Sequence, residues 1–308
     1  MKFAWRVILL IGALLTVFFW IIGNVLSDQY FITQWLEWMP TLFVLAMLTF
    51  TSLVLACMRA WKQLILSVCL CAAISMWYSM YENKLFAQCD GSSELTMVAW
   101  TMSHPKKDFS KESAEFIVNL DADITLLSHG WYVRGEEEIN EWLGDSGKKL
   151  VRFPFTVLTK VPPVEIKPLI ASDSIHIVSF TFDTTKELGR NTVLWAVDFP
   201  SSLSRSRYAV AMSSKRLLSE IEWSVPDIVA GDFNMTTDSA SIHYLFPQLR
   251  DASQLGGCGI MASYPRVLPL LLIDHTLVCE SLDVKAYKLL DPNHGRHRVQ
   301  WIEFKRNP

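Results

Sequence analysis

The chain is poor in charge. Asp, Glu, Lys and Arg make up 19% of its 308 residues, whereas hydrophobic residues make up 51%. The 31 acidic and 28 basic residues nearly cancel, and the cations do not gather into a basic stripe. Surfaces that bind a nucleic-acid backbone usually carry clustered cations, so this balance argues against DNA or RNA as a partner.

Cysteine is also scarce, with six residues and no Cys-x-x-Cys pair, which argues against a structural zinc site. Internal repeats and low-complexity tracts are absent, which excludes a repeat architecture. Three cysteines lie in long apolar runs. The other three, Cys89, Cys258 and Cys279, lie outside them, where a disulfide would leave one thiol unpaired if this part of the chain is exported.

Three uncharged apolar runs occupy residues 7–27, 38–58 and 63–81. A helix needs about 20 apolar residues to cross the hydrocarbon core of a bilayer, so each run predicts a transmembrane helix. A cleaved signal peptide is the alternative for the first run. Its apolar region is longer than usual for a signal peptide, and no small-x-small cleavage site follows it.

The basic residues near these runs predict the orientation. Lys2 and Arg6 precede the first run, and Arg59 and Lys62 lie in the turn between the second and third. Short loops rich in Lys and Arg stay in the cytoplasm. The N-terminus is therefore expected inside an inner (cytoplasmic) membrane and everything after about Tyr81 outside it, in the periplasm or the extracellular space.

The rest of the chain alternates between strand and helix patterns. We expect a transmembrane anchor at 1–82, a polar linker at 83–94 and one domain at 95–308. Strands are predicted at 95–100, 124–131, 153–160, 175–183, 192–200, 227–233, 270–278, 282–291 and 299–306, and helices at 111–122, 135–145, 206–223 and 239–249. This pattern predicts an α/β sandwich in which two sheets face each other and helices cover their outer faces.

Three motifs in this domain carry a family resemblance: "IVAGDFN" from Ile228, "LLIDHTLV" from Leu271 and "GRHRVQWIEF" from Gly295. In this order and spacing they resemble the endonuclease/exonuclease/phosphatase superfamily, which has a DNase I-like fold. The resemblance covers roughly residues 95–306. It implies a four-layer α/β/β/α sandwich and metal-assisted hydrolysis of phosphoesters.

The resemblance assigns four retained site positions. Asp232 and Asn234 of the GDFN motif would orient the attacking water and bind phosphate. Asp274 and His297 would complete the acid–base and phosphate contacts. These side chains are the types that phosphoryl chemistry requires.

Four other positions depart from the family pattern. Met102 or a neighbour replaces an Asn, His129 replaces the metal-binding Glu, Asp198 replaces a His, and Arg296 replaces the Asp of a Ser-Asp-His signature. A thioether is a poor ligand for Mg²⁺, and an imidazole suits Zn²⁺ or Mn²⁺ better. His129 is thus either a replacement metal ligand or a residue that fills the space of the lost Glu, and we favour the second. We also expect Asp198 and Arg296 to form an ion pair.

The four histidines His104, His176, His243 and His294 show no metal-ligand spacing. The favoured hypothesis is a membrane-anchored, outward-facing domain with a degenerate site, which binds or scaffolds at the cell envelope without a cofactor. The alternative is an active phosphoesterase, dependent on a divalent metal such as Mg²⁺ or Mn²⁺, that hydrolyses a lipid phosphate or phosphodiester. The expected partners are the lipid bilayer and either a lipid phosphate or an envelope protein.

Overall fold

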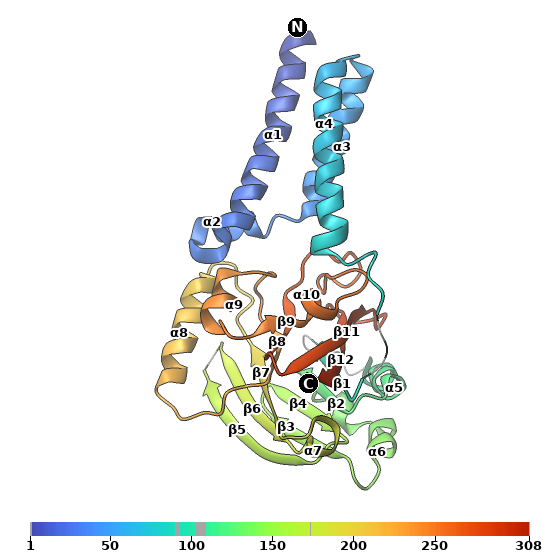
Figure 1. Cartoon of the computed structure of the whole chain (residues 1–308), viewed down its shortest axis with the longest axis vertical. Coiled ribbons are helices and arrows are strands. Elements are labelled where there is room, and N and C mark those ends of the chain that lie inside the picture. Colours follow the sequence, from blue (N-terminus) through green and yellow to red (C-terminus); the bar gives the residue numbers. More distant parts are fainter. Residues whose placement is uncertain (1, 90, 92, 103–108, 173, 308) are drawn as a thin grey trace.

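The computed structural model describes residues 2–89, 91, 93–102, 109–172 and 174–307. Long helices extend from one end of a compact α/β domain (Figure 1). The helices of this extension are α1 (Lys2–Leu26), η1 (Ser27–Gln29), α2 (Phe31–Glu37), α3 (Thr41–Cys57), α4 (Trp61–Trp77) and η2 (Tyr78–Glu82).

Two stretches of these helices, Ala4–Gln29 and Trp61–Glu82, are long and apolar enough to cross a membrane. A third span, which the sequence predicted, requires α2 and α3 to act together, and these helices meet at a bend of 63°. The break has a local cause, because Pro40 has an extended backbone and α3 begins after it. With 17 residues, α3 is roughly 26 Å long, slightly shorter than a hydrocarbon core.

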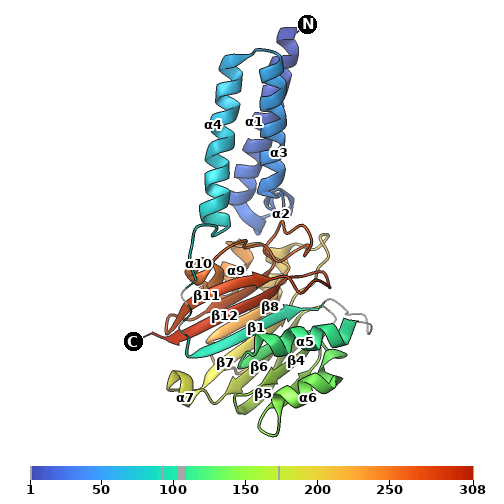
Figure 2. The same cartoon turned by 90° about the vertical axis from the view of Figure 1, so that its right-hand side faces the viewer.

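The N-terminus and the α3–α4 turn lie together at the end of the helices that is far from the domain (Figures 1 and 2). Arg6 in α1 donates a hydrogen bond to the carbonyl of Met58, just before that turn. The cations Arg6, Arg59 and Lys62 are therefore at the opposite end of the helices from the domain.

The domain contains two six-stranded sheets, with the orders β11-β12-β1-β2-β4-β3 and β5-β6-β7-β8-β10-β9. The strands of the first sheet are β1 (Leu95–Thr101), β2 (Ile124–Ser128), β3 (Lys148–Arg152), β4 (Phe155–Thr159), β11 (Leu282–Leu290) and β12 (Val299–Arg306). Those of the second are β5 (Pro163–Ala171), β6 (His176–Phe182), β7 (Thr192–Asp198), β8 (Ile228–Asp232), β9 (Arg250–Asp251) and β10 (Asp274–Val278).

Three apolar clusters separate the layers. One lies between the sheets and includes Met97, Ala99 and Phe180. A second packs β1 and β2 against α5 (Ser110–Leu120) and α6 (Glu137–Leu143), and a third packs β7 and β8 against α8 (Arg207–Ser219) and α9 (Ala240–Leu245). The remaining short helices are η4 (Val133–Gly135), α7 (Thr185–Leu188) and α10 (Ala252–Gly256). The layers form an α/β/β/α sandwich, as predicted.

A polar junction joins the membrane helices to the domain. Asp28 is fully buried, and it accepts hydrogen bonds from the Ser239 hydroxyl (2.9 Å) and the Ser241 amide (3.0 Å) at the start of α9. Gln34 in α2 accepts a hydrogen bond from the amide of Arg207 at the start of α8 (2.8 Å). Both contacts satisfy amide groups that have no partner within their own helix.

The connection that follows the helices is fixed to the domain as well. The side chain of Asn83 accepts a hydrogen bond from the amide of Met261 (2.7 Å). A disulfide joins Cys89 to Cys258, and Cys279 remains a free thiol. The three-part division at 1–82, 83–94 and 95–308 stays a prediction, although β1 does begin at Leu95.

We expect Asp28→Ala to destabilise the protein, because it leaves two buried donors without an acceptor, at about 1–3 kcal/mol. For a chain of this size that corresponds to a melting temperature lower by about 5 °C. Tryptophan fluorescence during heating of the detergent-solubilised protein measures the shift. Asp145→Ala, on an exposed turn, serves as the control. Equal melting temperatures for both variants would refute the role of this carboxylate.

Candidate functional site

The site lies where several strands end at one edge of the sandwich. Strands β1 and β2 are parallel, as are β7 and β8, so their carboxyl ends meet there. Strands β10 and β12 run antiparallel to β8 and β1 and begin at the same edge. In this register Asp232 is opposite both Asp198 and Asp274. The topology therefore gathers polar residues that are far apart in the sequence.

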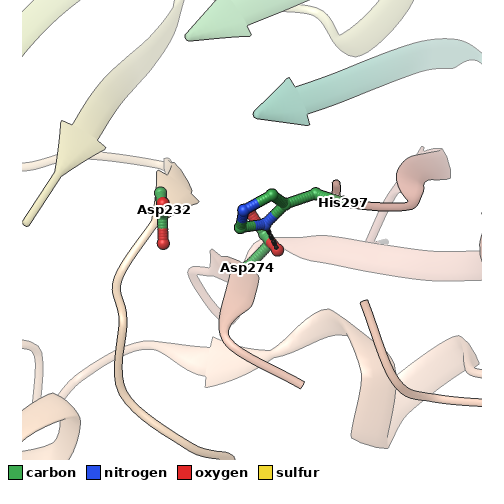
Figure 3. Close-up of side chains that lie close together, drawn as sticks. All are labelled: Asp232, Asp274 and His297. Carbon is green, nitrogen blue, oxygen red and sulfur yellow. Dashed lines mark hydrogen bonds and ion pairs between the residues drawn. The ribbon is translucent and has the colours of Figure 1, made fainter. Parts of the chain in front are cut away.

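A carboxylate–imidazole pair lies at the centre of this edge (Figure 3). Nδ1 of His297 is 2.8 Å from Oδ2 of Asp274, and both residues are buried. Burial opposes the charge on His297, but the Asp274 carboxylate outweighs it and raises the pKa of His297 to about 9. The same contact keeps the pKa of Asp274 below its usual range despite complete burial. The two groups form an internal ion pair at neutral pH.

Asp232 lies beside this pair. Burial and the neighbouring Asp274 carboxylate raise its pKa well above the ordinary value, so its neutral form is favoured. Its Oδ1 accepts a hydrogen bond from the amide of Asn234 (3.1 Å), and the Asn234 side chain donates to the carbonyl of Phe199 (2.9 Å). The preceding Gly231 is required because a Cβ there would lie 2.0 Å from the carbonyl oxygen of Val197.

The sequence predicts that Met102 or a neighbour lies at the site, and the structure shows which of these side chains at the end of β1 does so. Met102 packs in the apolar cluster beneath α5, together with Val98 and Trp100. Its neighbour Thr101 alternates to the other face, and its hydroxyl donates to Oδ1 of Asp274 (2.5 Å). Thr101 is therefore the residue at the cleft where the family pattern has an Asn.

The predicted ion pair between Asp198 and Arg296 is wrong. Asp198 instead contacts His129, with 3.2 Å between Oδ2 and Nε2. Arg296 donates to the hydroxyl of Tyr264 (2.8 Å). His129 follows β2 and Asp198 ends β7, so this contact joins the edges of the two sheets.

Among the described residues, one group has the donors for a metal ion: Asp232, Asp274 and His297, with ligand atoms within 4.8 Å of one another. The group does not fit Mg²⁺ well. Both oxygens of Asp274 already accept hydrogen bonds, and His297 holds a proton at neutral pH. The positions for the family's Asn and Glu offer a hydroxyl and an imidazole, whereas Mg²⁺ prefers an octahedron of carboxylate and water oxygens.

The cleft around these residues has a volume of about 1110 Å³. Arg205 and Arg296 supply cations to its lining, and Phe153 supplies an exposed aromatic ring. Trp38, at the end of α2, lines it as well. The cleft therefore extends from the strand ends to the domain-side end of the N-terminal helices.

Comparison with solved structures agrees with this architecture. An endonuclease/exonuclease/phosphatase from Beutenbergia cavernae superposes with a TM-score of 0.53 and 14% identity over 69% of this chain and 72% of that chain. The chain has the endonuclease/exonuclease/phosphatase, DNase I-like fold. A family protein from Bacteroides thetaiotaomicron (TM-score 0.52, 15% identity, 68% and 97% covered) and truncated TDP2 from Caenorhabditis elegans (0.53, 13%, 68% and 97%) are similar to it. No family model and no curated protein matches the sequence.

Within this DNase I-like fold, the sequence missed three residues at the cleft. Thr101 was detectable from the alternation of β1, since Met97 and Ala99 share its face. His176 was judged ordinary, yet it begins β6 opposite Asp198. Trp38 had no local signal, because its place in the cleft depends on how the helices dock. His104 lies outside the described residues.

The raised pKa of His297 predicts a pH-dependent stability. Its ordinary pKa of 6.5 rises to about 9, so the contribution is fully present below pH 6.5 and is lost as the pH rises through 9. The loss is about 3 kcal/mol. Melting temperatures between pH 6 and 10 should fall more for the wild type than for His297→Gln. His243→Gln, at an exposed site, should follow the wild type. Parallel profiles for the wild type and His297→Gln would contradict the assignment.

Proposed function

We propose that this protein is a membrane-anchored phosphate-binding protein that uses a DNase I-like domain without its hydrolytic activity. The observation that carries the proposal is the distribution of changes in the cleft. The groups assigned to phosphate, Asn234 and His297, remain, whereas the positions assigned to the metal hold Thr101 and His129.

The electrostatics of the cleft favour an anion. His297 is cationic at neutral pH and is stabilised by Asp274. Burial and the Asp274 carboxylate raise the pKa of Asp232, which disfavours a repelling charge on this residue. Arg205 and Arg296 add positive charge to the lining. Charged donors of this kind are strong partners of phosphate oxygens.

The position of the cleft favours a phosphate that belongs to a lipid. Trp38 reaches the cleft from the base of the helices, and the Arg207 guanidinium lies over its ring at 5.5 Å. A headgroup at the membrane surface is therefore near the opening. Free phosphate is the competing ligand, and the binding experiment below compares it with a phosphorylated lipid.

Hydrolysis and binding assays on the detergent-purified protein test this proposal. We expect no turnover of p-nitrophenyl phosphate or bis-p-nitrophenyl phosphate above that of Asp232→Ala in Mg²⁺, Mn²⁺ or Zn²⁺. Calorimetry should detect binding of dihexanoyl phosphatidic acid, and His297→Gln and Arg296→Gln should each weaken it about tenfold, the value of one charged hydrogen bond. His243→Gln is the control.

Three outcomes would overturn all or part of this proposal. Metal-dependent turnover that Asp232→Ala abolishes would establish the active phosphoesterase instead. Equal affinity for inorganic phosphate and dihexanoyl phosphatidic acid would remove the lipid from the proposal, and no binding of either would remove the phosphate.

We also propose that α1, α4 and the bent α2–α3 pair all anchor the protein in the inner membrane, with the domain outside. The cations Arg6, Arg59 and Lys62 at the far end of the helices support a cytoplasmic N-terminus. The Cys89–Cys258 disulfide supports an oxidising compartment for the domain.

The disulfide provides a test of orientation. When membranes are solubilised in excess N-ethylmaleimide, we expect mass spectrometry to find the Cys89–Cys258 cross-link and no alkylation of either residue. Prior treatment with dithiothreitol should make both reactive, which is the control. Alkylation of both without dithiothreitol would place the domain in a reducing compartment.

A further inference from the structure

One wall of the cleft is a loop without regular secondary structure. It consists of residues 199–206, between the end of β7 and the start of α8, and we call it the wall segment. Backbone groups outside helices and strands need other hydrogen-bond partners, so neighbouring side chains decide whether such a loop keeps one shape. The residues of the wall segment that line the cleft are Phe199, Pro200, Ser201, Ser202, Leu203 and Arg205.

The side chain of Gln34 in α2 holds the second half of the wall segment. Its nitrogen donates to the carbonyls of Leu203 (3.3 Å) and Arg205 (3.2 Å). Its oxygen accepts a hydrogen bond from the amide of Arg207 (2.8 Å), and Gln34 is only 1% exposed. Both N–H groups and the oxygen of this side chain are therefore used on one short stretch of the domain.

The first half of the wall segment is held by Arg207, which is fully buried at the start of α8. Its guanidinium donates to the carbonyl of Pro200 and to that of Ser201 (3.2 Å). The same guanidinium lies over the ring of Trp38, the residue that follows α2, at 5.5 Å. The N-terminal helices thus contact the wall segment directly through Gln34 and support the group that holds its other half.

Arg205 is the cation of the wall segment. One of its terminal nitrogens donates to the hydroxyl of Ser174 (2.5 Å), which lines the cleft from the loop between β5 and β6. Arg205 is exposed, and this contact uses one of the five N–H donors of its guanidinium, so the group can also donate to a phosphate in the cleft. Because Gln34 fixes the carbonyl of Arg205, it fixes the point from which this side chain enters the cleft.

We propose that Gln34 is a positioning residue of the cleft and that α2 is therefore part of the ligand site. By holding the backbone at Leu203 and Arg205, it keeps the Arg205 guanidinium where a phosphate can bind. Donors that are already in place bind more tightly, because less conformational freedom is lost on binding. This inference rests on the proposed function, and it adds that the N-terminal helices contribute to ligand binding as well as to anchoring.

Calorimetry with dihexanoyl phosphatidic acid on the full-length protein in detergent tests this role. Gln34→Met keeps the length of the side chain and removes its polar groups, so we expect binding about tenfold weaker, as for Arg205→Gln. Because Gln34 acts through Arg205, the double variant should bind no more weakly than Arg205→Gln alone. Thr33→Ala is the control, since this buried hydroxyl of α2 bonds to the backbone of Tyr30 at the start of the same helix.

Limited proteolysis measures the wall segment without a ligand. Trypsin cleaves after Arg205 only when the surrounding backbone leaves its place, so Gln34→Met should speed this cleavage at least tenfold. Gln34→Glu, which keeps an oxygen for the Arg207 amide but loses both donors, should do the same if Gln34→Met does not fold. Cleavage after Lys186, on α7 at the far end of the domain from the helices (Figure 1), should be unchanged. Thr33→Ala should match the wild type at both sites.

Two results would overturn the role of Gln34. One is an additive loss, with the double variant binding about a hundredfold more weakly than the wild type. The other is cleavage after Arg205 at the wild-type rate in the Gln34 variants. Failure of the proposed function is distinguishable, because the wild type would then bind neither dihexanoyl phosphatidic acid nor inorganic phosphate. The cleavage rates alone then decide whether α2 positions the wall segment: a tenfold rise upholds it and unchanged rates refute it.

Discussion

The contact between the buried Asp28 carboxylate and the start of α9 is the interaction on which the rest of this molecule depends. Asp28 lies just after α1, yet its partners Ser239 and Ser241 belong to the domain. Together with Gln34, it fixes the short helix α2 against the starts of α8 and α9. That position makes Trp38 a wall of the cleft. Without it, the helices would be a tether only.

The cleft contains two contacts between an imidazole and a carboxylate. His129 and Asp198 face each other, with 3.2 Å between Nε2 and Oδ2. In the Asp274–His297 ion pair, the two opposite charges neutralise each other. Two of the four positions at which the sequence departs from the family pattern, His129 and Asp198, thus contact each other. A fold can retain ligand recognition after such changes because recognition needs donors, whereas hydrolysis also needs a metal or a positioned water.

Much of the fold followed from local pattern. Alternating apolar residues predicted most strands, and the three motifs predicted the sandwich. The sequence reading missed β5, whose Pro163 and Pro168 suit only an edge strand, and β5 is an edge strand of its sheet. It left open whether Met102 or a neighbour lies at the site, because one residue decides which face of a strand a side chain occupies, and Thr101 is the one that lines the cleft. The prediction of an Asp198–Arg296 ion pair is wrong for a related reason. Two residues at the same sheet edge do not necessarily have side chains in contact.

The sequence by itself determined the apolar helices, the layered α/β domain and the identity of Asp232, Asn234, Asp274 and His297, because periodicity and motif spacing are local properties of a chain. The tertiary structure decided which helices are straight enough to span, which cysteines pair, and how the helices meet the domain. Those outcomes depend on contacts between residues up to about 200 positions apart, such as Asp28 and Ser239. No local pattern encodes such contacts, and the place of Trp38 in the wall of the cleft arises from them.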